Sequence, residues 1–397
     1  MKVLVTSYPS LSHLMPMVPL CWALRAAGHE VLVACPPDFT DAARSVALNA
    51  IGVGAPRWPQ ERASRGTGEK SWERISFPLE FSRERDTAEV RVFEGFLATE
   101  AALPACLEYG EYLQVAHDWG ADLLLHDPFD PVARLVGAVL GLPVVMHRFG
   151  LDPTPGPFAE RTQELLRMPA LLLGLADAPG STLIVDPCPP SLQLPDVPQG
   201  HLVRYVPFNG AGDAPSWSLR RSGRRRICVC IGRTLGGIIP SIIRRTIEAT
   251  SGLDGVELIV AAAPETREHL GEVGADVRIL ESFPMQLVLP SCDLCVHQGG
   301  AGTGLTASAL GVPQLVFPQM GPDQFGFGSN LAEQGAGINL PTAEEQSDIG
   351  LIRSSAVAIL GDESYRAAAE KLRAEIESAP SPGSLAPVLE DLVLNGR

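Results

Sequence analysis

The sequence lacks an excess of positive charge, a long apolar run and a second cysteine pair. Its 397 residues carry a formal net charge of −15. This balance excludes a general binder of nucleic acid, which needs a broad basic face, so any site for an anionic ligand has to be local. No apolar stretch approaches the ~20 residues that span a bilayer, so no stable membrane insertion is expected.

Cysteine usage indicates neither a disulfide framework nor a metal site. The eight cysteines are scattered, and Cys292 and Cys295 form a single C-x-x-C. One such pair is weak support for zinc. The N-terminus, MKVLVTSYPS, enters a short β-type run without the pattern of a cleaved leader. We therefore expect buried, reduced cysteines in a cytoplasmic protein.

What the sequence does have is a large apolar fraction, arranged in short runs. Hydrophobic residues make up 45% of the chain and charged residues 19%, which favours a sizeable core over disorder. The runs alternate with helical patterns and are typical of parallel strands covered on both faces. They are KVLVT (2–6), EVLVA (30–34), DLLLH (122–126), PVVMH (143–147), ICVCI (227–231), ELIVA (257–261), VRIL (277–280), DLCVH (293–297) and PQLVF (313–317).

The alternation of strands and helices occurs twice along the chain. We therefore predict an α/β protein with two doubly wound, Rossmann-like domains. The stretch 206–226 is rich in Pro, Gly and Arg and has no periodicity, so the domain boundary is placed there. The stretch 354–397 is predicted to be helical, with a break at APSPGS (379–384).

Residues 56–112 do not follow this alternation and are rich in aromatic side chains. Two interpretations stay open for these rings: they line a site for a flat apolar molecule, or they belong to the core. The aromatic residues are Trp58, Trp72, Phe77, Phe81, Phe93, Phe96, Tyr109 and Tyr112.

The stretch VHQGGAGTGLTASALGVPQ places glycines where a buried strand turns into a helix. Backbone N–H groups at the start of a helix have no partner within the helix, and the helix dipole favours negative charge there. Without side chains, a phosphate can approach these N–H groups closely. The alternative is a tight turn that only serves packing. The predicted pyrophosphate site consists of His297, Gly299, Gly300, Ala301, Gly302 and Thr303.

Two other segments follow predicted strands and extend this site. IGRTLGG (231–237) offers Gly232, Arg233 and Thr234 to the same anion, although a plain surface turn is equally compatible. In GPDQ, Asp323 and Gln324 supply acceptors and a donor side by side, which suits the hydroxyl groups of a sugar.

Taken together, these stretches resemble a known family over nearly the whole chain. The segment VHQGGAGT…GVPQLVFPQMGPDQFGFGSNLAEQGAGINLP resembles the donor signature of inverting, nucleotide-sugar-dependent glycosyltransferases with the GT-B fold. SLSHLMPMVPLCWALRAAGHEV, LLLHDPFDPVARLVGAVLGLPVV and RYVPFNGAGDAPSW are similar to the family's opening turn, acceptor domain and linker. The most similar subgroup is that of bacterial enzymes that decorate macrolides and aromatic polyketides.

The resemblance implies a domain organisation. Residues 1–208 form the acceptor-binding domain, 209–225 the linker, and 226–380 the domain that binds the nucleotide sugar. Residues 381–397 form a C-terminal helix that packs back on the first domain.

The resemblance also implies a catalytic base. A poor hydroxyl nucleophile needs a base in the transition state. The family's base corresponds to His13 here, and the aspartate that orients it corresponds to Asp127; Asp130 competes for that role. Taken without the family, the residues favour an ordinary N-cap or packing histidine at His13 over a catalytic one. The aglycone is expected near Ser10, Trp72, Phe77, Phe81 and Phe93.

The donor is expected to be a TDP-sugar, and the acceptor a hydrophobic aglycone. Many bacterial relatives read HHGG where this chain has Gln298, and the tryptophan that stacks on the base is replaced near Ser282, where Phe283 can substitute. UDP-sugar relatives often carry a glutamate at the position of Leu305, and its replacement by leucine favours TDP over UDP as the donor nucleotide. The sequence has no D-x-D-like pair, so no metal and no cofactor are expected.

The predicted function is transfer of a deoxysugar to a polyketide-like or other natural product, with inversion. A nucleotide-sugar epimerase and a non-catalytic sugar-nucleotide-binding protein are the alternatives. The aglycone, the sugar, the type of bond (to oxygen, nitrogen or carbon) and the need for an activator protein stay open. The oligomeric state, with a homodimer as one candidate, is also open.

Overall fold

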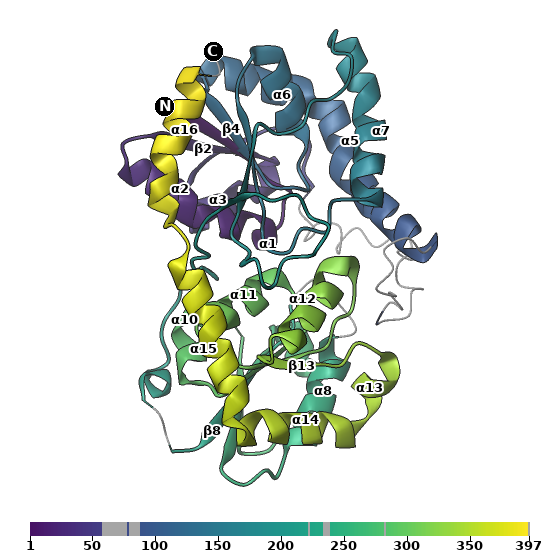
Figure 1. Ribbon diagram of the computed structural model, residues 1–397, viewed down its shortest axis with the longest axis vertical. Helices are drawn as coiled ribbons and strands as arrows, with labels where there is room; N and C mark the ends of the chain where they lie inside the picture. The colour runs from purple at the N-terminus through teal and green to yellow at the C-terminus, as the bar shows by residue number, and fades with distance from the viewer. Residues whose placement is uncertain (58–77, 79–87, 221–222, 233–238, 282, 396–397) are drawn as a thin grey trace.

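The computed structural model describes residues 1–57, 78, 88–220, 223–232, 239–281 and 283–395. It contains two parallel sheets, each flanked by helices, which form two α/β domains stacked along the long axis of the molecule (Figure 1). The predicted fold class, GT-B with two Rossmann-like domains, is confirmed.

The first domain is built on a seven-stranded sheet in the order β3-β2-β1-β4-β5-β6-β7. Its strands are β1 (Lys2–Thr6), β2 (Glu30–Cys35), β3 (Asn49–Gly52), β4 (Leu123–His126), β5 (Val144–His147), β6 (Leu183–Asp186) and β7 (His201–Leu202). Its helices are α1 (Leu11–Leu14), α2 (Val18–Ala26), α3 (Thr40–Ser45), α5 (Ala88–Trp119), α6 (Val132–Leu140) and α7 (Pro157–Leu172), with 3₁₀ turns η1 (Met15–Met17) and η2 (Pro37–Phe39).

The second domain is built on a six-stranded sheet in the order β10-β9-β8-β11-β12-β13. Its strands are β8 (Arg225–Cys230), β9 (Val256–Ala261), β10 (Val277–Leu280), β11 (Leu294–His297), β12 (Gln314–Val316) and β13 (Gly337–Asn339). Its helices are α8 (Ile239–Thr250), α9 (Pro264–Glu268), α10 (Met285–Val288), α11 (Ala301–Ala309), α12 (Gly321–Glu333), α13 (Ala343–Ser347), α14 (Ile349–Gly361) and α15 (Glu363–Ser378). The 3₁₀ turns η4 (Ser216–Leu219) and η6 (Leu289–Ser291) precede β8 and β11.

The predicted strands form because both of their faces are covered. Every residue of β4 and of β11 is buried, which explains runs without polar alternation. The sequence did not reveal β3, β6, β7 and β13. The first of these, β3, lies at the edge of its sheet and is mostly exposed, so its sequence NAIG carries no continuous apolar signal.

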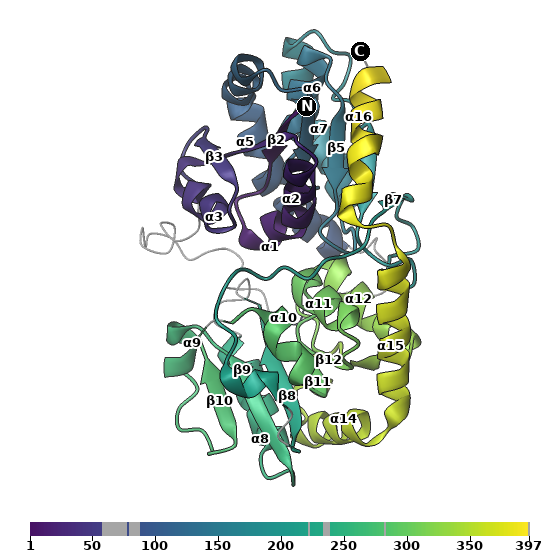
Figure 2. The same cartoon turned by 90° about the vertical axis from the view of Figure 1, so that its left-hand side faces the viewer.

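The C-terminal segment crosses from the second domain to the first. Helix α15 lies along the second domain, and α16 (Leu385–Asn395) continues beside α2 on the first (Figures 1 and 2). The turn between them, η7 (Pro382–Ser384), falls in the predicted break. The backbone N–H of Arg204 donates to the carbonyl of Pro380 at 2.7 Å, and Leu389 is fully buried against the core of the first domain.

A continuous apolar cluster joins the two domains; we call it the interdomain cluster. It brings together Leu151, Leu194 and Tyr205 from the first domain and Leu305 and Phe327 from the second, along with further side chains of α12 and α15. Because apolar burial is favourable, this cluster fixes how the two sheets face each other.

All eight cysteines are free thiols, and most are buried. Burial is the largest cause that raises the pKa of Cys21 to about 12, so this thiol stays protonated. Within the described part of the chain, we find no helix with the length and apolar character needed to cross a bilayer.

Candidate active site

His13 and Asp127 come together because their strands are neighbours. Strand β1 pairs with β4 in parallel register, with Thr6 opposite His126, so the loops that follow both strands leave the same edge of the sheet. His13 lies on α1, whose backbone begins at the N-cap Ser10, and the His13 N–H donates to the Ser10 carbonyl at 3.0 Å. His13 Nδ1 lies 3.1 Å from Asp127 Oδ1.

The carboxylate of Asp127 is fully buried and is fixed by three donors. Its Oδ2 accepts from the Tyr8 N–H at 2.7 Å, and its Oδ1 accepts from the Phe129 N–H at 2.7 Å as well as from His13. Burial alone raises the pKa of Asp127, but the His13 charge and these hydrogen bonds outweigh it and hold the pKa below its usual value. An ionised carboxylate only accepts, so the imidazole proton resides on Nδ1. His13 Nε2 is therefore left as a base.

Asp130, the competing aspartate, is placed differently. Its side chain accepts from the Val132 N–H at 3.3 Å. Burial, and then the nearby Asp127 charge, raise the pKa of Asp130 to about 7. Of the two carboxylates, Asp127 is the one that contacts His13, and it is ionised at neutral pH while Asp130 is only partly ionised.

Three aromatic rings surround His13, and sequence reasoning missed all of them. The ring centroids of Tyr8, Phe129 and Phe149 lie 5.2, 5.0 and 4.8 Å from that of His13. Tyr8 follows β1, Phe129 follows β4 and Phe149 follows β5, all at the carboxyl edge of the sheet. A search for aromatic residues just after buried strands would have found them. We refer to Tyr8, Phe129 and Phe149 as the aromatic box.

The glycine-rich turn lies across the molecule, at the carboxyl end of β11. Gly299 has φ +82°, a left-handed conformation that favours glycine, and a Cβ there would also lie 2.8 Å from the Gln324 carbonyl. Gly300 is the N-cap of α11, and the first intrahelical bond runs from the Gly304 N–H to the Gly300 carbonyl. The N–H groups of the first turn of α11 have no partner within the helix. Helix α11 lies on the side of the second domain that faces the first (Figure 2), and its Ala301 packs against Gly150 of the first domain.

His297 adopts a role different from the one expected. Its Nδ1 accepts from the Gly299 N–H at 3.0 Å, so Nε2 carries the proton and donates to Gln314 Oε1 at 2.7 Å. Burial lowers the pKa of His297 to about 4. Both nitrogens of this neutral ring are engaged within the protein. The ring N–H expected to contact a phosphate is directed to Gln314, and His297 shapes the turn through Gly299.

Gln298, noted in the sequence only as a departure from relatives, bridges two glycine turns. Its Oε1 accepts from the Gly232 N–H at 2.9 Å. A Cβ at Gly300 would lie 2.8 Å from Gln298 Nε2, and a Cβ at Gly232 would clash with the same atom. Glycine at both positions thus makes room for one side-chain amide, whose NH₂ group lies beside the turn.

Asp323 and Gln324 occupy the first turn of α12, next to this turn. Gln324 Oε1 accepts from the backbone N–H groups of Gln319 and Met320 at 3.1 and 3.2 Å. Its oxygen therefore holds its own loop, and its amide N–H groups are what it can offer to a ligand.

Leu305 occupies the position at which UDP-sugar relatives often carry a glutamate, but here its side chain is buried. It is fully buried in the interdomain cluster, and its Cδ1 would lie 3.3 Å from a Cβ at Gly150. The expectation took leucine, in place of the glutamate that binds the ribose in UDP-sugar relatives, as a sign of TDP, but the side chain is buried between the domains. The preference for TDP cannot be argued from Leu305.

Helix α11 is fastened to the first domain and to the linker. Gly150 fits against Ala301 so closely that a Cβ would lie 2.5 Å from the Ala301 Cβ. The Tyr205 hydroxyl donates to the Gly302 carbonyl at 3.2 Å, and the Thr306 hydroxyl lies 3.2 Å from Asn209 Oδ1. The glycine turn and the base are thus held at the same junction.

The chain is similar to known proteins over nearly its whole length. Family models described as the N-terminal and C-terminal domains of erythromycin biosynthesis protein CIII-like proteins match residues 22–232 and 244–392. An L-demethylnoviosyl transferase from Streptomyces niveus is 33% identical, with 97% of both chains covered. A tylactone mycaminosyltransferase from Streptomyces fradiae is 31% identical, with 100% of this chain and 94% of that protein covered.

The chain belongs to the EryCIII-like family of glycosyltransferases. The solved structure of the spinosyn rhamnosyltransferase SpnG is 42% identical, with a TM-score of 0.88, and covers 98% of this chain and 100% of its own. SpnG has also been solved with thymidine diphosphate and with spinosyn aglycone. The epimerase and the non-catalytic binding protein are therefore set aside, and the resemblance stated from the motifs is confirmed.

The remaining predicted residues of this EryCIII-like glycosyltransferase lie partly outside the described residues and partly on its helices and loops. Arg233, Thr234, Ser282, Trp72, Phe77 and Phe81, as well as Trp58, lie outside the described residues. Phe283 is half-buried and packs against the apolar core beneath α10. On α5, Tyr112 is buried in the core, while Phe93 is half-buried and Phe96 is 43% exposed.

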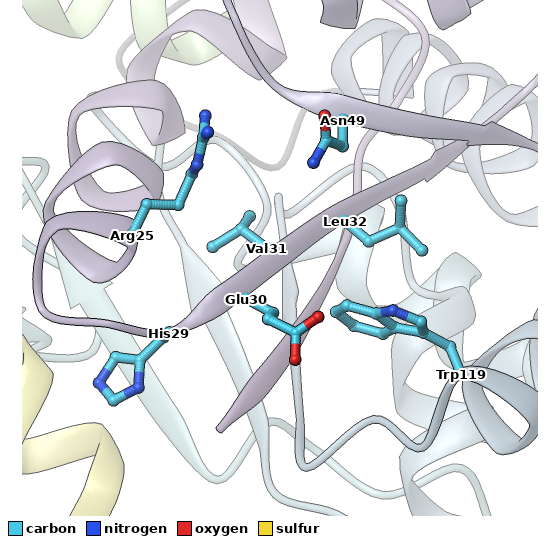
Figure 3. Close-up of a pocket in the computed structure, with 7 residues that line it drawn as sticks. All are labelled: Arg25, His29, Glu30, Val31, Leu32, Asn49 and Trp119. Atoms are coloured by element: carbon cyan, nitrogen blue, oxygen red, sulfur yellow. The ribbon is translucent and has the colours of Figure 1, made fainter.

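One surface pocket lies away from this site (Figure 3). It opens where β2 begins, whereas His13 lies at the edge where β1 and β4 end. Its lining consists of Arg25, His29, Glu30, Val31, Leu32, Asn49 and Trp119. This pocket contributes nothing to the chemistry at His13.

Proposed function

We propose that this glycosyltransferase transfers a deoxysugar from a TDP-sugar to a polyketide-like or related natural-product hydroxyl, with inversion. The observation that carries the proposal is the His13–Asp127 pair, held at the sheet edge that faces the first turn of α11. Relatives support the donor and acceptor classes, since SpnG has been solved with thymidine diphosphate and with an aglycone.

In the proposed reaction, His13 Nε2 takes the proton of the acceptor hydroxyl as its oxygen attacks C1 of the sugar. The bond between C1 and the diphosphate oxygen breaks on the opposite side, which inverts the anomeric centre. Asp127 stabilises the imidazolium that forms. TDP departs with negative charge, which the N–H groups and dipole at the start of α11 stabilise.

The sugar and diphosphate would be held by groups on α11, α12 and the adjoining turns. The amide N–H groups of Gln324 and the carboxylate of Asp323 are suited to sugar hydroxyls. The NH₂ group of Gln298, next to Gly300, is suited to a diphosphate oxygen. Because backbone and side-chain N–H groups would stabilise the negative charge of the diphosphate, no metal ion is needed for this purpose. We therefore expect transfer to persist in EDTA.

The experiment that tests the function is a transfer assay read by mass spectrometry. TDP-rhamnose is offered with tylactone, spinosyn aglycone and a hydroxylated anthraquinone. His13→Ala should abolish the glycoside product while TDP affinity, measured by calorimetry, stays within a few fold. A strongly weakened TDP affinity would mean that His13 belongs to the donor site, and wild-type protein without transfer or donor cleavage would contradict the function.

A further inference from the structure

Phe149 lies between the two halves of the site. On one side its ring is 4.8 Å from that of His13, at an interplanar angle of 62°. On the other side, the next residue, Gly150, fits against Ala301 in the first turn of α11. Two consecutive residues thus contact the two halves of the site: Phe149 contacts His13, and Gly150 contacts the first turn of α11. Under the proposed function, the acceptor oxygen and the sugar C1 meet at this junction.

The loop that carries Phe149 is held firmly from below. The Arg148 guanidinium is 1% exposed and donates to Asp152 Oδ2 at 2.8 Å, to Asp186 Oδ2 at 2.6 Å and to the Pro198 carbonyl at 2.7 Å. Leu151 is buried in the interdomain cluster. Anchors on both sides leave Phe149 little freedom to turn away from His13.

Asp127 organises the rest of the aromatic box. Its two carboxylate oxygens accept the backbone N–H groups of Tyr8 and Phe129, and the same carboxylate orients His13. Phe149 completes the box, with its centroid 5.8 Å from that of Phe129. Phe149 itself is half-buried.

We propose that Phe149 acts as a positioning residue that keeps water away from the line between His13 Nε2 and the sugar C1. A base that activates an acceptor hydroxyl also activates water. In that competing reaction, the water oxygen bonds to C1, the bond from C1 to the diphosphate oxygen breaks, and His13 takes the proton. The products are free sugar and TDP. Apolar walls on the ring of His13 remove places where water can bind next to Nε2. When the aglycone binds, its own apolar surface fills the space that water would otherwise occupy.

This inference rests on the proposed function and predicts a change in partition between two acceptors. Phe149→Ala should raise the ratio of donor hydrolysis to glycoside formation by roughly tenfold, because the opened wall admits water and loosens the aglycone. TDP affinity should stay within about twofold, since the proposed diphosphate contacts are on α11 and the turn before it. Phe149→Tyr, which keeps the ring, should restore the wild-type ratio.

The assay uses the full chain with TDP-rhamnose, with and without spinosyn aglycone, and measures TDP, free rhamnose and glycoside. Phe208→Ala is the matched control, because Phe208 forms an edge-to-face pair with Trp22, 4.9 Å between centroids, outside the site. If Phe149→Ala fails to fold, Phe149→Leu makes the same distinction.

An unchanged or lower hydrolysis ratio in folded Phe149→Ala or Phe149→Leu protein would overturn the shielding role and leave the transferase function standing. An equal rise in Phe208→Ala would also overturn it, because the effect would then be general loosening. Wild-type protein that neither transfers nor hydrolyses would overturn the proposed function itself.

Discussion

The charge of Asp127 organises the base end of the site. This one buried carboxylate orients His13 and holds the backbone of two rings of the aromatic box. Asp130, three residues on, is desolvated beside it and has its pKa raised to about 7. Asp127 is therefore ionised at neutral pH while Asp130 is only partly ionised, and Asp127 is the carboxylate that contacts His13 and can pair with an imidazolium.

Replacement of the two aspartates by asparagine separates these roles. Asp127→Asn removes the charge that stabilises protonated His13, so kcat for transfer should fall about a hundredfold or more. Asp130→Asn leaves the hydrogen bond between His13 and Asp127 in place and should change kcat little at pH 7. Steady-state kinetics with TDP-rhamnose checks both variants. Equal losses would mean that the turn, rather than the charge, is what matters.

Gln298 offers an isosteric test of the diphosphate site. Gln298→Glu keeps an oxygen for the Gly232 N–H but replaces the NH₂ beside Gly300 with negative charge. TDP affinity should fall between about tenfold and a hundredfold at low salt. Calorimetric titration measures it, and the thermal midpoint serves as the control for folding. Unchanged affinity would show that the amide only bridges the two turns.

Helix α11 is held in place by contacts at its N-terminal turn and along its inner face. Its N-terminal turn faces the first domain, and its inner face enters the interdomain cluster through Leu305. Close contacts at Gly150 and at Gly304, where a Cβ would meet the Phe327 ring, set its position. A substitution on this helix should therefore act first through stability and domain placement.

Leu305→Glu tests that view. A carboxylate at a fully buried, apolar position should lower the free energy of unfolding by about 3 kcal/mol or more. Denaturant unfolding measures the change, and Leu305→Met should be nearly neutral. A folded, equally stable Leu305→Glu protein that prefers UDP donors would contradict the position assigned to this side chain.

Helix α16 offers a second test at the scale of one element. Leu389 is fully buried in the core of the first domain, whereas Leu394 on the same helix is 77% exposed to solvent. Leu389→Ala should cost about 2–5 kcal/mol of stability, and Leu394→Ala almost none. Thermal unfolding compares the pair. Equal effects would mean that α16 does not hold the domains together.

For the whole molecule, buried neutral histidines make stability depend on pH. Burial lowers the pKa of His126, of His147 and of His297 to about 4, against an ordinary value near 6.5. Between these values the unfolded chain binds more protons than the folded one, so stability rises with pH. The contribution of each histidine is complete above about pH 6.5 and is lost as the pH falls toward 4.

Unfolding at several pH values measures this linkage. Each histidine should add up to about 1.4 kcal/mol per pH unit to the slope between pH 6.5 and 4. His147→Gln should reduce the slope by one proton or less. A slope that stays the same in this variant would mean that His147 is already protonated in the folded protein.

The sequence by itself determined the features that depend on neighbours along the chain. Short apolar runs predict buried strands because both faces of a parallel sheet are covered, and glycines after β11 predict a turn that can admit an anion. The resemblance also placed His13 and Asp127, and the structure brings them to 3.1 Å. Edge strands such as β3 gave no such signal, since their exposed residues lack a continuous apolar pattern.

Only the tertiary structure decided how these features face one another. It turned Leu305 into the interdomain cluster, directed His297 to Gln314, and brought Phe149 to His13 across 136 positions of the printed chain. Each of these depends on contacts between segments far apart in sequence, where packing and buried hydrogen bonds choose one orientation for a side chain. Local pattern has no access to that choice, because it is made by atoms from other strands and from the other domain.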